Sequence, residues 1–144
     1  MRMDKLTHSL QAALGEAQSL AIGRDHPFIE PLHLLKAMLD SAGSAPRALL
    51  MAAGAAVESL HSSVDTALRA MATVSGSEDV HFSQETQRLL NRADKLSQKA
   101  GDTYLSTDAV LLAMLESKST ASLLSEAGVA AQSLERAIES ARGG

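Results

Sequence analysis

The chain has no cysteine, no tryptophan and very few aromatic residues of any kind. Its 144 residues include two phenylalanines and one tyrosine, so aromatics make up 2% of the sequence. Without cysteine, disulfides and thiol chemistry are excluded, and the composition fits a reducing compartment. Because aromatic and β-branched residues favour strands, their scarcity predicts a helical fold. Hydrophobic residues of all kinds make up 45% of the chain and aromatics only 2%, so the core of that fold must be mainly aliphatic.

The sequence also lacks a basic stripe and a long apolar run. Its formal net charge is -4, and acidic and basic residues alternate along it. Nucleic acids bind surfaces rich in lysine and arginine, so we expect no nucleic-acid partner. No apolar run approaches the roughly 20 residues of a membrane span, and the first residues lack the apolar segment of a signal peptide. We therefore expect no membrane partner and a cytoplasmic location.

What the sequence does contain is a duplication. Residues 82–117 align with residues 6–41 after a shift of 76 positions. Further along, a gap of two residues reduces the shift to 74 positions, and residues 123–134 then align with residues 49–60. Most of the matched positions are apolar, and they include Leu14 with Leu90, Ala17 with Ala93, Leu20 with Leu96 and Met38 with Met114. Such self-similarity indicates two copies of one supersecondary unit that pack against each other.

We predict one domain over residues 1–144, organised as two copies. The first copy covers about 1–71 and the second about 81–142. A linker at 72–80 joins them, with Ser75-Gly76-Ser77 as its flexible tip. Each copy is expected to form four helices, which gives an all-α fold of about eight helices in two pseudo-two-fold-related halves.

Capping residues recur at equivalent places in the two copies. Thr7 and Ser83 are expected N-caps, because a hydroxyl oxygen accepts a free amide of the first helical turn. Gly23 and Gly101 lie near the ends of the same two helices, where glycine adopts a left-handed C-cap at little cost. Each copy therefore begins with one capped helix of similar length.

The second helix of each copy is predicted to lie at the centre of the fold. Residues 31–41 and 107–117 are apolar on most helical faces, and such a helix is buried on most faces. Short extended stretches at 27–29 and 103–105 precede these helices. Nothing in the sequence predicts a strand.

Four strings occur in the order and spacing that one family shows. They are MR-x-DKLT at 1–7, AQSLA-x-G at 17–23, IEPLHLL at 29–35 and DKL-x-QK-x-GD at 94–102. Together they resemble the N-terminal domain of the ClpB-type protein disaggregases. The resemblance covers essentially the whole chain and includes Arg142-Gly143-Gly144, so we expect a domain cut from a longer protein.

The resemblance implies a docking module, not an enzyme. In this family the N-terminal domain engages unfolded or aggregated polypeptide, and AAA+ domains that form an ATP-driven hexameric ring thread it through a pore. No Gly-x-x-x-x-Gly-Lys-Ser/Thr phosphate loop occurs in this chain, so ATP is expected only in the AAA+ domains of the parent. We expect no cofactor and no catalytic residue here, and an isolated domain that is monomeric.

The resemblance also implies polar site residues. Thr7, Asp102 and Asp108 match surface positions that the family uses for chaperone activity. Each has an ordinary structural alternative. Thr7 can serve as an N-cap worth about 1 kcal/mol, Asp108 can face a helix dipole, and Asp102 can be a loop residue that follows a glycine cap.

The apolar part of the implied site is a shallow groove between the copies. Leu96 and Ala109 match groove-lining positions, and Leu90 is a further candidate. The small Ala109 and the charged Arg92 make this groove less apolar than in relatives. The alternative is that these residues belong to the core, as leucines on a helical stripe usually do.

Three other functions compete with polypeptide docking. The first is docking of a folded adaptor or co-chaperone, which the related ClpA and ClpC N-terminal domains imply; the second is a helical spacer, and the third is an enzyme. A di-metal site is disfavoured, because Glu30-x-x-His33 has the right spacing but the second copy offers Ser106 and Ala109. No Ser–His–Asp arrangement can be argued from the scattered histidines.

Overall fold

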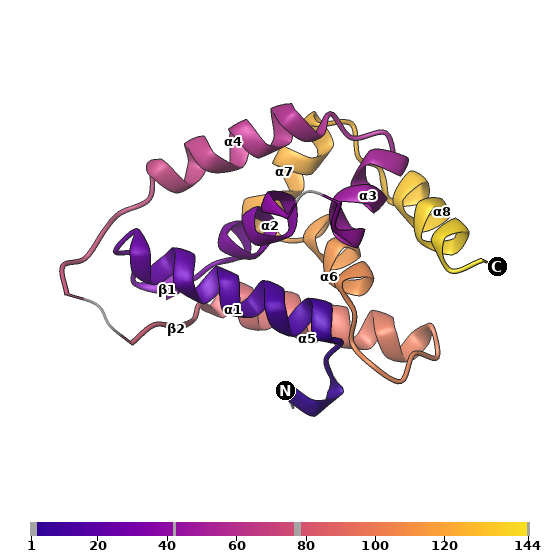
Figure 1. The fold of residues 1–144 in the computed structure, drawn as a ribbon, viewed down its shortest axis with the longest axis horizontal. Helices are drawn as coiled ribbons and strands as arrows, with labels where there is room; N and C mark the ends of the chain where they lie inside the picture. Colours follow the sequence, from indigo (N-terminus) through magenta and orange to yellow (C-terminus); the bar gives the residue numbers. More distant parts are fainter. Residues whose placement is uncertain (1–2, 42, 77–78, 144) are drawn as a thin grey trace.

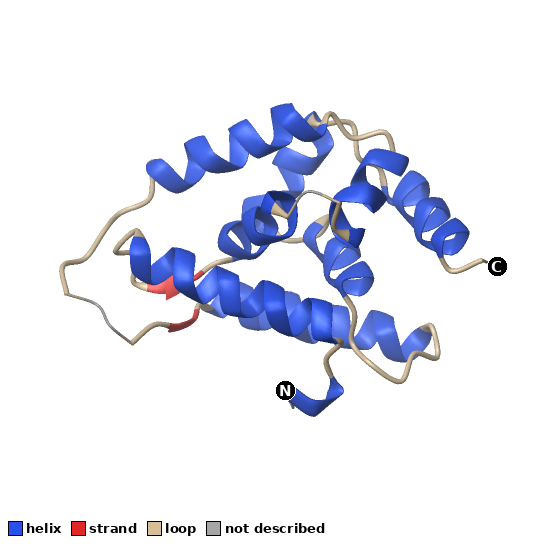
Figure 2. Cartoon of the chain, viewed as in Figure 1, coloured by secondary structure: helices blue, strands red, loops and turns tan. Residues whose placement is uncertain are grey.

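The computed structural model describes residues 3–41, 43–76 and 79–143. Ser77 of the predicted linker tip and Gly144 lie outside these residues. The described residues form eight α-helices and one small parallel sheet (Figures 1 and 2), which confirms the predicted all-α class. None of these helices is both long and apolar enough to cross a membrane. The elements are α1 (His8–Gly23), β1 (Phe28–Ile29), α2 (Pro31–Asp40), α3 (Ala45–Ala52), α4 (Val57–Arg69), β2 (His81–Phe82), α5 (Gln84–Lys99), α6 (Thr107–Met114), α7 (Lys118–Glu126) and α8 (Ala131–Ala141).

The first helix of each copy starts at the predicted cap. The Thr7 hydroxyl oxygen accepts the Leu10 amide at 3.2 Å, and the Ser83 hydroxyl oxygen accepts the Thr86 amide at 3.1 Å. Gly101 has a φ of 79°, as the C-cap prediction requires. In the first copy, however, the left-handed residue is Asp25, with a φ of 58°. Helix α1 continues through Gly23, so the prediction for that glycine was wrong by two positions.

A short parallel strand pair joins the two copies. Strand β1, from the first copy, pairs with β2, the segment that leads into α5, so that Phe28 faces His81 and Ile29 faces Phe82. The sequence predicted an extended stretch at 27–29 but no strand. A two-residue strand has no room for the alternating pattern by which strands are found in sequences, and its partner here comes from a distant segment.

The same connection occurs a second time with the copies exchanged. Leu6, which leads into α1, forms a parallel bridge with Leu105 of the second copy. Thr7 donates its amide to the Leu105 carbonyl at 2.9 Å, and Ser83 donates its amide to the Ile29 carbonyl at 3.2 Å. These pairs differ by the 76 positions that separate the copies. Each copy therefore enters its first helix from a segment that is bonded to the other copy.

Helices α2 and α6 form the interior, as their composition predicts. Every residue of α2 from Pro31 to Leu39 is buried, and α6 buries all but two of its eight residues. Helix α2 contacts α1, α4 and α7, and α8 lies against α3 and α6 (Figure 1). Both central helices end earlier than predicted, at Asp40 and Met114.

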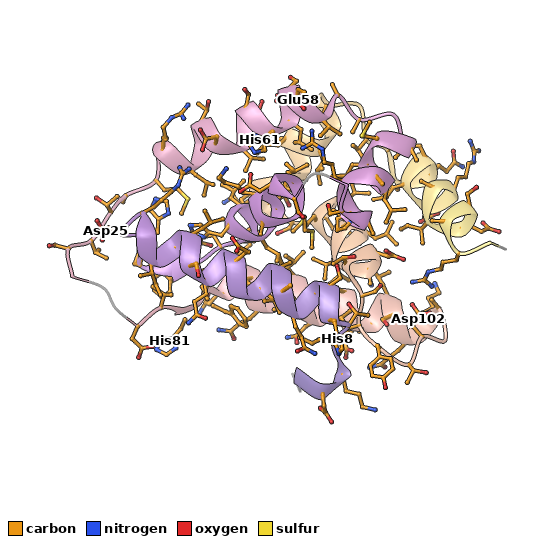
Figure 3. All side chains as sticks on the ribbon, in the orientation of Figure 1. His8, Asp25, Glu58, His61, His81 and Asp102 are labelled. Carbon is orange, nitrogen blue, oxygen red and sulfur yellow. The ribbon has the colours of Figure 1, made fainter. Side chains whose placement is uncertain are left out.

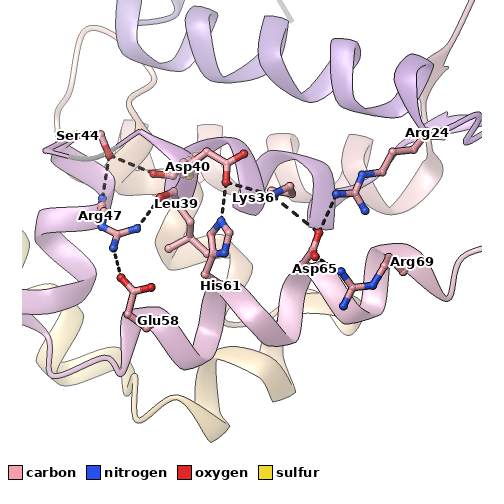
Figure 4. Close-up of polar contacts among 11 residues, drawn as sticks. Arg24, Lys36, Leu39, Asp40, Ser44, Arg47, Glu58, His61, Asp65 and Arg69 are labelled. Carbon is pink, nitrogen blue, oxygen red and sulfur yellow. Dashed lines mark hydrogen bonds and ion pairs between the residues drawn. The ribbon is translucent and has the colours of Figure 1, made fainter.

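Ion pairs connect α4 to α2 and to Arg24 at the end of α1 (Figure 4). Asp65 of α4 accepts a hydrogen bond from Arg24 at 2.7 Å and lies 4.0 Å from the Lys36 ammonium group. One turn further along α2, Asp40 accepts from Lys36 at 3.1 Å and lies 2.6 Å from the His61 Nε2 atom. The hydrogen bond from Arg24 lowers the pKa of the Asp65 carboxyl. Single exposed pairs stabilise little, but here several charges share partners in one network.

Two buried histidines connect the end of α1 to α2. Glu30 donates its amide to His33 Nδ1 at 2.8 Å, so the neutral His33 ring carries its proton on Nε2. That nitrogen lies 2.7 Å from His26 Nδ1, to which it donates. The Glu30-x-x-His33 spacing thus serves a helix start, and no group of three potential metal ligands occurs among the described residues.

Helix α7 receives its cap from a different helix. Its N-cap residue Ser117 makes no side-chain capping bond of its own. Instead, Glu85 of α5 accepts hydrogen bonds from the Ser117 hydroxyl at 2.7 Å, the Ser119 amide at 2.8 Å and the Ser119 hydroxyl at 2.7 Å. Burial alone would raise the pKa of Glu85, but these hydrogen bonds outweigh it and lower the pKa. A carboxylate at this position also interacts favourably with the helix dipole.

The histidine pair predicts a loss of stability in mild acid. Burial lowers the pKa of His33 from 6.5 to about 4, and it lowers the pKa of His26 as well. Between about pH 6.5 and pH 4 these histidines therefore bind protons in the unfolded chain but stay neutral in the folded chain, which favours unfolding as the pH falls. We expect the free energy of unfolding in urea to fall by at least about 1 kcal/mol between about pH 7.5 and pH 5.5.

A matched pair of variants isolates this effect. His33→Gln removes the titrating ring but keeps an acceptor that can reach the Glu30 amide. It should flatten the pH dependence, whereas His81→Gln, at an exposed histidine, should keep the wild-type slope. An unchanged slope in His33→Gln would contradict the assignment.

The shared cap predicts a cost for Glu85→Gln. The substitution removes the negative charge that accepts three hydrogen bonds at the start of α7, so unfolding should become easier by about 1 kcal/mol. Urea denaturation measures this difference, and Glu135→Gln on the exposed part of α8 supplies the control. Equal stabilities of the two variants would show that Glu85 does not act as the cap.

Candidate docking site at the seam between the copies

Asp102 and Asp108 are brought together by one arginine. Asp102 lies in the loop after α5 (Figure 3), and Asp108 lies in the first turn of α6. Arg142, which follows α8, donates from Nη1 and Nη2 to the two Asp102 oxygens at 3.0 and 3.1 Å. Its Nε donates to Asp108 Oδ2 at 3.1 Å. The hydrogen bonds to Asp102 raise the pKa of Arg142 above its already high ordinary value.

Thr7 is near this cluster in the fold but is engaged differently. Its side chain is half-buried and caps α1, while its amide is bonded to Leu105, one residue before the N-cap of α6. That N-cap, Ser106, has a buried hydroxyl oxygen with no hydrogen-bond partner among the described residues. Residues of both copies therefore meet at the start of α6, and one polar atom there is unsatisfied.

The structure separates the three predicted groove residues. Leu90 is 2% exposed and Ala109 is 5% exposed, so both belong to the core. Leu96 is partly buried and packs against the same core from its edge. Of the three, only Leu96 offers apolar surface. Position within a helical stripe does not distinguish these cases, because all three residues fall on the inward side of their helices.

The surface beside Asp102 is hollowed. An open hollow of about 520 Å³ lies between α5, the 102–105 loop and the segment that enters α1. Seven of its nine lining residues are polar, and the full set is Lys5, Leu6, Asn91, Asp94, Ser97, Gln98, Asp102, Thr103 and Leu105. We call it the second-copy hollow. It contains the predicted site residue Asp102, which is bonded through Arg142 to Asp108.

A second hollow occupies the equivalent place in the first copy. It has a volume of about 350 Å³ and is lined by Gln11, Leu14, Gly15, Gln18, Ile29, Val80, His81 and Phe82. Most of these residues are the counterparts of second-copy hollow residues under the 76-position shift. We call it the first-copy hollow. Its lining carries more apolar side chains and no carboxylate, so the two hollows have the same framework but different chemistry.

Sequence reasoning missed the first-copy hollow, although Gly15 could have indicated it. A glycine inside a helix costs roughly 0.5–1 kcal/mol relative to alanine, so it calls for a reason. Apart from its chain neighbours and the backbone of its own helix, no atom of the described chain lies within 4 Å of where a Gly15 Cβ would stand. Internal packing therefore does not require this glycine. Because glycine has no side chain, it leaves the hollow deeper at this point than another residue would.

Two of the few aromatic residues are chain neighbours of residues that line the hollows. Phe28 is 47% exposed and Tyr104 is 53% exposed, and the two occupy equivalent positions in the two copies. Phe28 directly precedes Ile29, which lines the first-copy hollow, and Tyr104 lies between Thr103 and Leu105, which line the second-copy hollow. Their exposed rings at equivalent places in the two copies make them candidates for contact with a partner.

Comparisons with known proteins agree with this architecture. The family model for the Clp repeat (R) N-terminal domain matches residues 5–127. The chain is 43% identical to the chaperone protein ClpB of Pseudomonas putida and 42% identical to that of Vibrio cholerae. Each match covers the whole of this chain but only 17% of the chaperone, so the chain spans about one sixth of the length of these relatives.

Solved structures show the same fold. The N-terminal domain of Hsp104 from Candida albicans superposes with a TM-score of 0.84 at 23% identity, over 96% of this chain and 92% of that one. The ClpV N-domain in complex with a VipB peptide superposes with a TM-score of 0.73 at 29% identity, over 91% of this chain and 82% of that one. The chain therefore belongs to the family of Clp repeat N-terminal domains.

Proposed function

We propose that this domain docks unfolded or aggregated polypeptide for an ATP-dependent disaggregating chaperone. Polypeptide would bind weakly at the seam between the copies and pass to AAA+ motor domains of a longer, hexameric, cytoplasmic parent. In this proposal the domain itself binds no ATP and catalyses no reaction. In this proposal Thr7, Leu96, Asp102 and Asp108 contact the polypeptide, and the buried Leu90 and Ala109 support the site from the core.

The observation that carries this proposal is the pair of equivalent hollows, each with an exposed aromatic residue next in the chain to one of its lining residues. A chain that has only two phenylalanines and one tyrosine leaves two of the three half exposed, where they add nothing to the aliphatic core. Large side chains beside a shallow hollow can contact short apolar stretches without requiring a defined sequence. A ClpV N-domain solved with a bound peptide supports peptide docking by this fold.

The shallow geometry limits the affinity. The hollows are open and small, so a bound segment buries little surface, and much of the gain is offset by the loss of freedom of both partners. We therefore propose dissociation constants from about 1 mM to the high micromolar range. Weak binding suits a module that must release its polypeptide to a motor.

We expect a titration with a reduced, carboxymethylated and permanently unfolded protein to shift amide resonances between residues 82 and 115. A Phe28→Ser, Tyr104→Ser double variant should weaken this binding severalfold, because each aromatic side chain is a major contributor of contact area. NMR chemical shifts measure the binding. Met51→Ser is the matched control, since Met51 is a large apolar residue that is 61% exposed on α3, away from both hollows.

The outcomes separate this function from its alternatives. If no resonance moves between 82 and 115 or at the first-copy hollow, the proposed function is wrong and a passive helical spacer is favoured. If the double variant binds as tightly as Met51→Ser, polypeptide docks elsewhere on the domain.

A second candidate function is docking of a folded adaptor or co-chaperone. The observation in its favour is the group of carboxylates Asp94, Asp102 and Asp108 at the second-copy hollow and its rim, which offers a charged surface. Such binding should weaken as salt rises, because exposed charges are screened beyond about 10 Å at 0.1 M salt. Docking at the hollows through apolar contacts should depend little on salt, so titrations at low and high ionic strength distinguish the two.

A further inference from the structure

Arg142 occupies the two carboxylates that the proposed site would offer to a partner. Its planar guanidinium uses Nη1 and Nη2 on Asp102 and Nε on Asp108, so three of its nitrogen atoms donate hydrogen bonds. This arrangement matches the fork shape of arginine, which an ammonium group cannot reproduce. The pair of carboxylates is therefore shaped for a guanidinium, and in the unbound domain the chain supplies its own.

We call the place where Asp102, Asp108 and Arg142 meet the junction of the second copy. The equivalent junction in the first copy is built differently. Asp102, Asp108 and Arg142 correspond to His26, Leu32 and Leu68 under the alignment of the two copies, and Ala109 corresponds to His33. There the two histidine rings are bonded to each other in the core, and His26 also bonds to the backbone of Leu68. The first copy thus closes this junction with a buried, neutral contact.

In the second copy the same junction is held by an ion pair at the surface. The Arg142 side chain is 42% exposed, and those of Asp102 and Asp108 are 22% and 20% exposed. An exposed pair contributes modestly to stability and is weakened by salt. Arg142 lies just beyond the last turn of α8, so opening this pair need not disturb the buried residues of that helix, Leu134, Ala137 and Ile138.

We propose that Arg142 is an internal occupant of the Asp102–Asp108 pair, and that an arginine side chain of a docking polypeptide replaces it. This inference rests on the proposed function. It adds a preference for polypeptides that contain arginine, and it makes docking depend on the opening of the Arg142 contacts. Polypeptide segments that carry arginine beside apolar residues are preferred, since they fill the hollow and take over the carboxylates. Docking of such a segment and opening of the Arg142 side-chain contacts then favour each other, because such coupling is reciprocal.

The test uses two short acetylated apolar peptides that differ at one central position, arginine in one and the uncharged isostere citrulline in the other. Their dissociation constants are measured by NMR titration for wild type and for Arg142→Gln. Removing the internal competitor should lower the dissociation constant of the arginine peptide roughly two- to fivefold, which is the value of an exposed ion pair. The citrulline peptide should bind both proteins equally.

Two further variants make the result specific. Arg136→Gln removes the same charge from an exposed position of α8 and should leave both peptides at wild-type affinity. Asp102→Asn should abolish the preference for arginine over citrulline. Urea unfolding of each variant confirms that it is folded at the temperature of the titration.

Each outcome has a definite meaning. An arginine peptide that binds Arg142→Gln no tighter than wild type overturns the replacement, while the proposed docking function stands. A gain of equal size in Arg136→Gln overturns it too, since net charge alone would then explain the effect. If neither peptide binds any of the proteins, the docking function fails, and this inference fails with it.

Discussion

The fold depends on a reciprocal exchange of short backbone segments between the two copies. The segment before α5 is bonded to Ile29, and the segment before α1 is bonded to Leu105. Neither copy can complete its own entry into its first helix, because each needs a carbonyl from the other. The two halves should therefore fold and unfold together, as their single shared hydrophobic core also requires.

The exchange also explains where the hollows lie. Each hollow has one wall from the first helix of a copy and another from the bonded segments that cross between copies. Duplication makes the framework the same in both places, and later divergence makes the chemistry different. Under the 76-position shift, Phe82 and Gln18 of the first-copy hollow correspond to Leu6 and Asp94 of the second-copy hollow.

Much of the architecture could be predicted from local sequence. The N-caps Thr7 and Ser83, the buried central helices and the duplication all depend on residues close together in the chain or on comparison of the chain with itself. The crossed strands and the Arg142 contacts could not be predicted, since Arg142 meets residues 40 and 34 positions away. Leu90 and Ala109 show a related limit, because a helical stripe identifies an inward face without saying whether a groove reaches it.

The placement of Tyr104 gives the protein its own optical reporter. With no tryptophan and one tyrosine in the chain, near-ultraviolet absorption and intrinsic fluorescence come mainly from this single ring. It is about half exposed and lies in the chain between Thr103 and Leu105, which line the second-copy hollow. Changes in its emission or its quenching by dissolved iodide therefore follow the environment of that segment, without any attached dye.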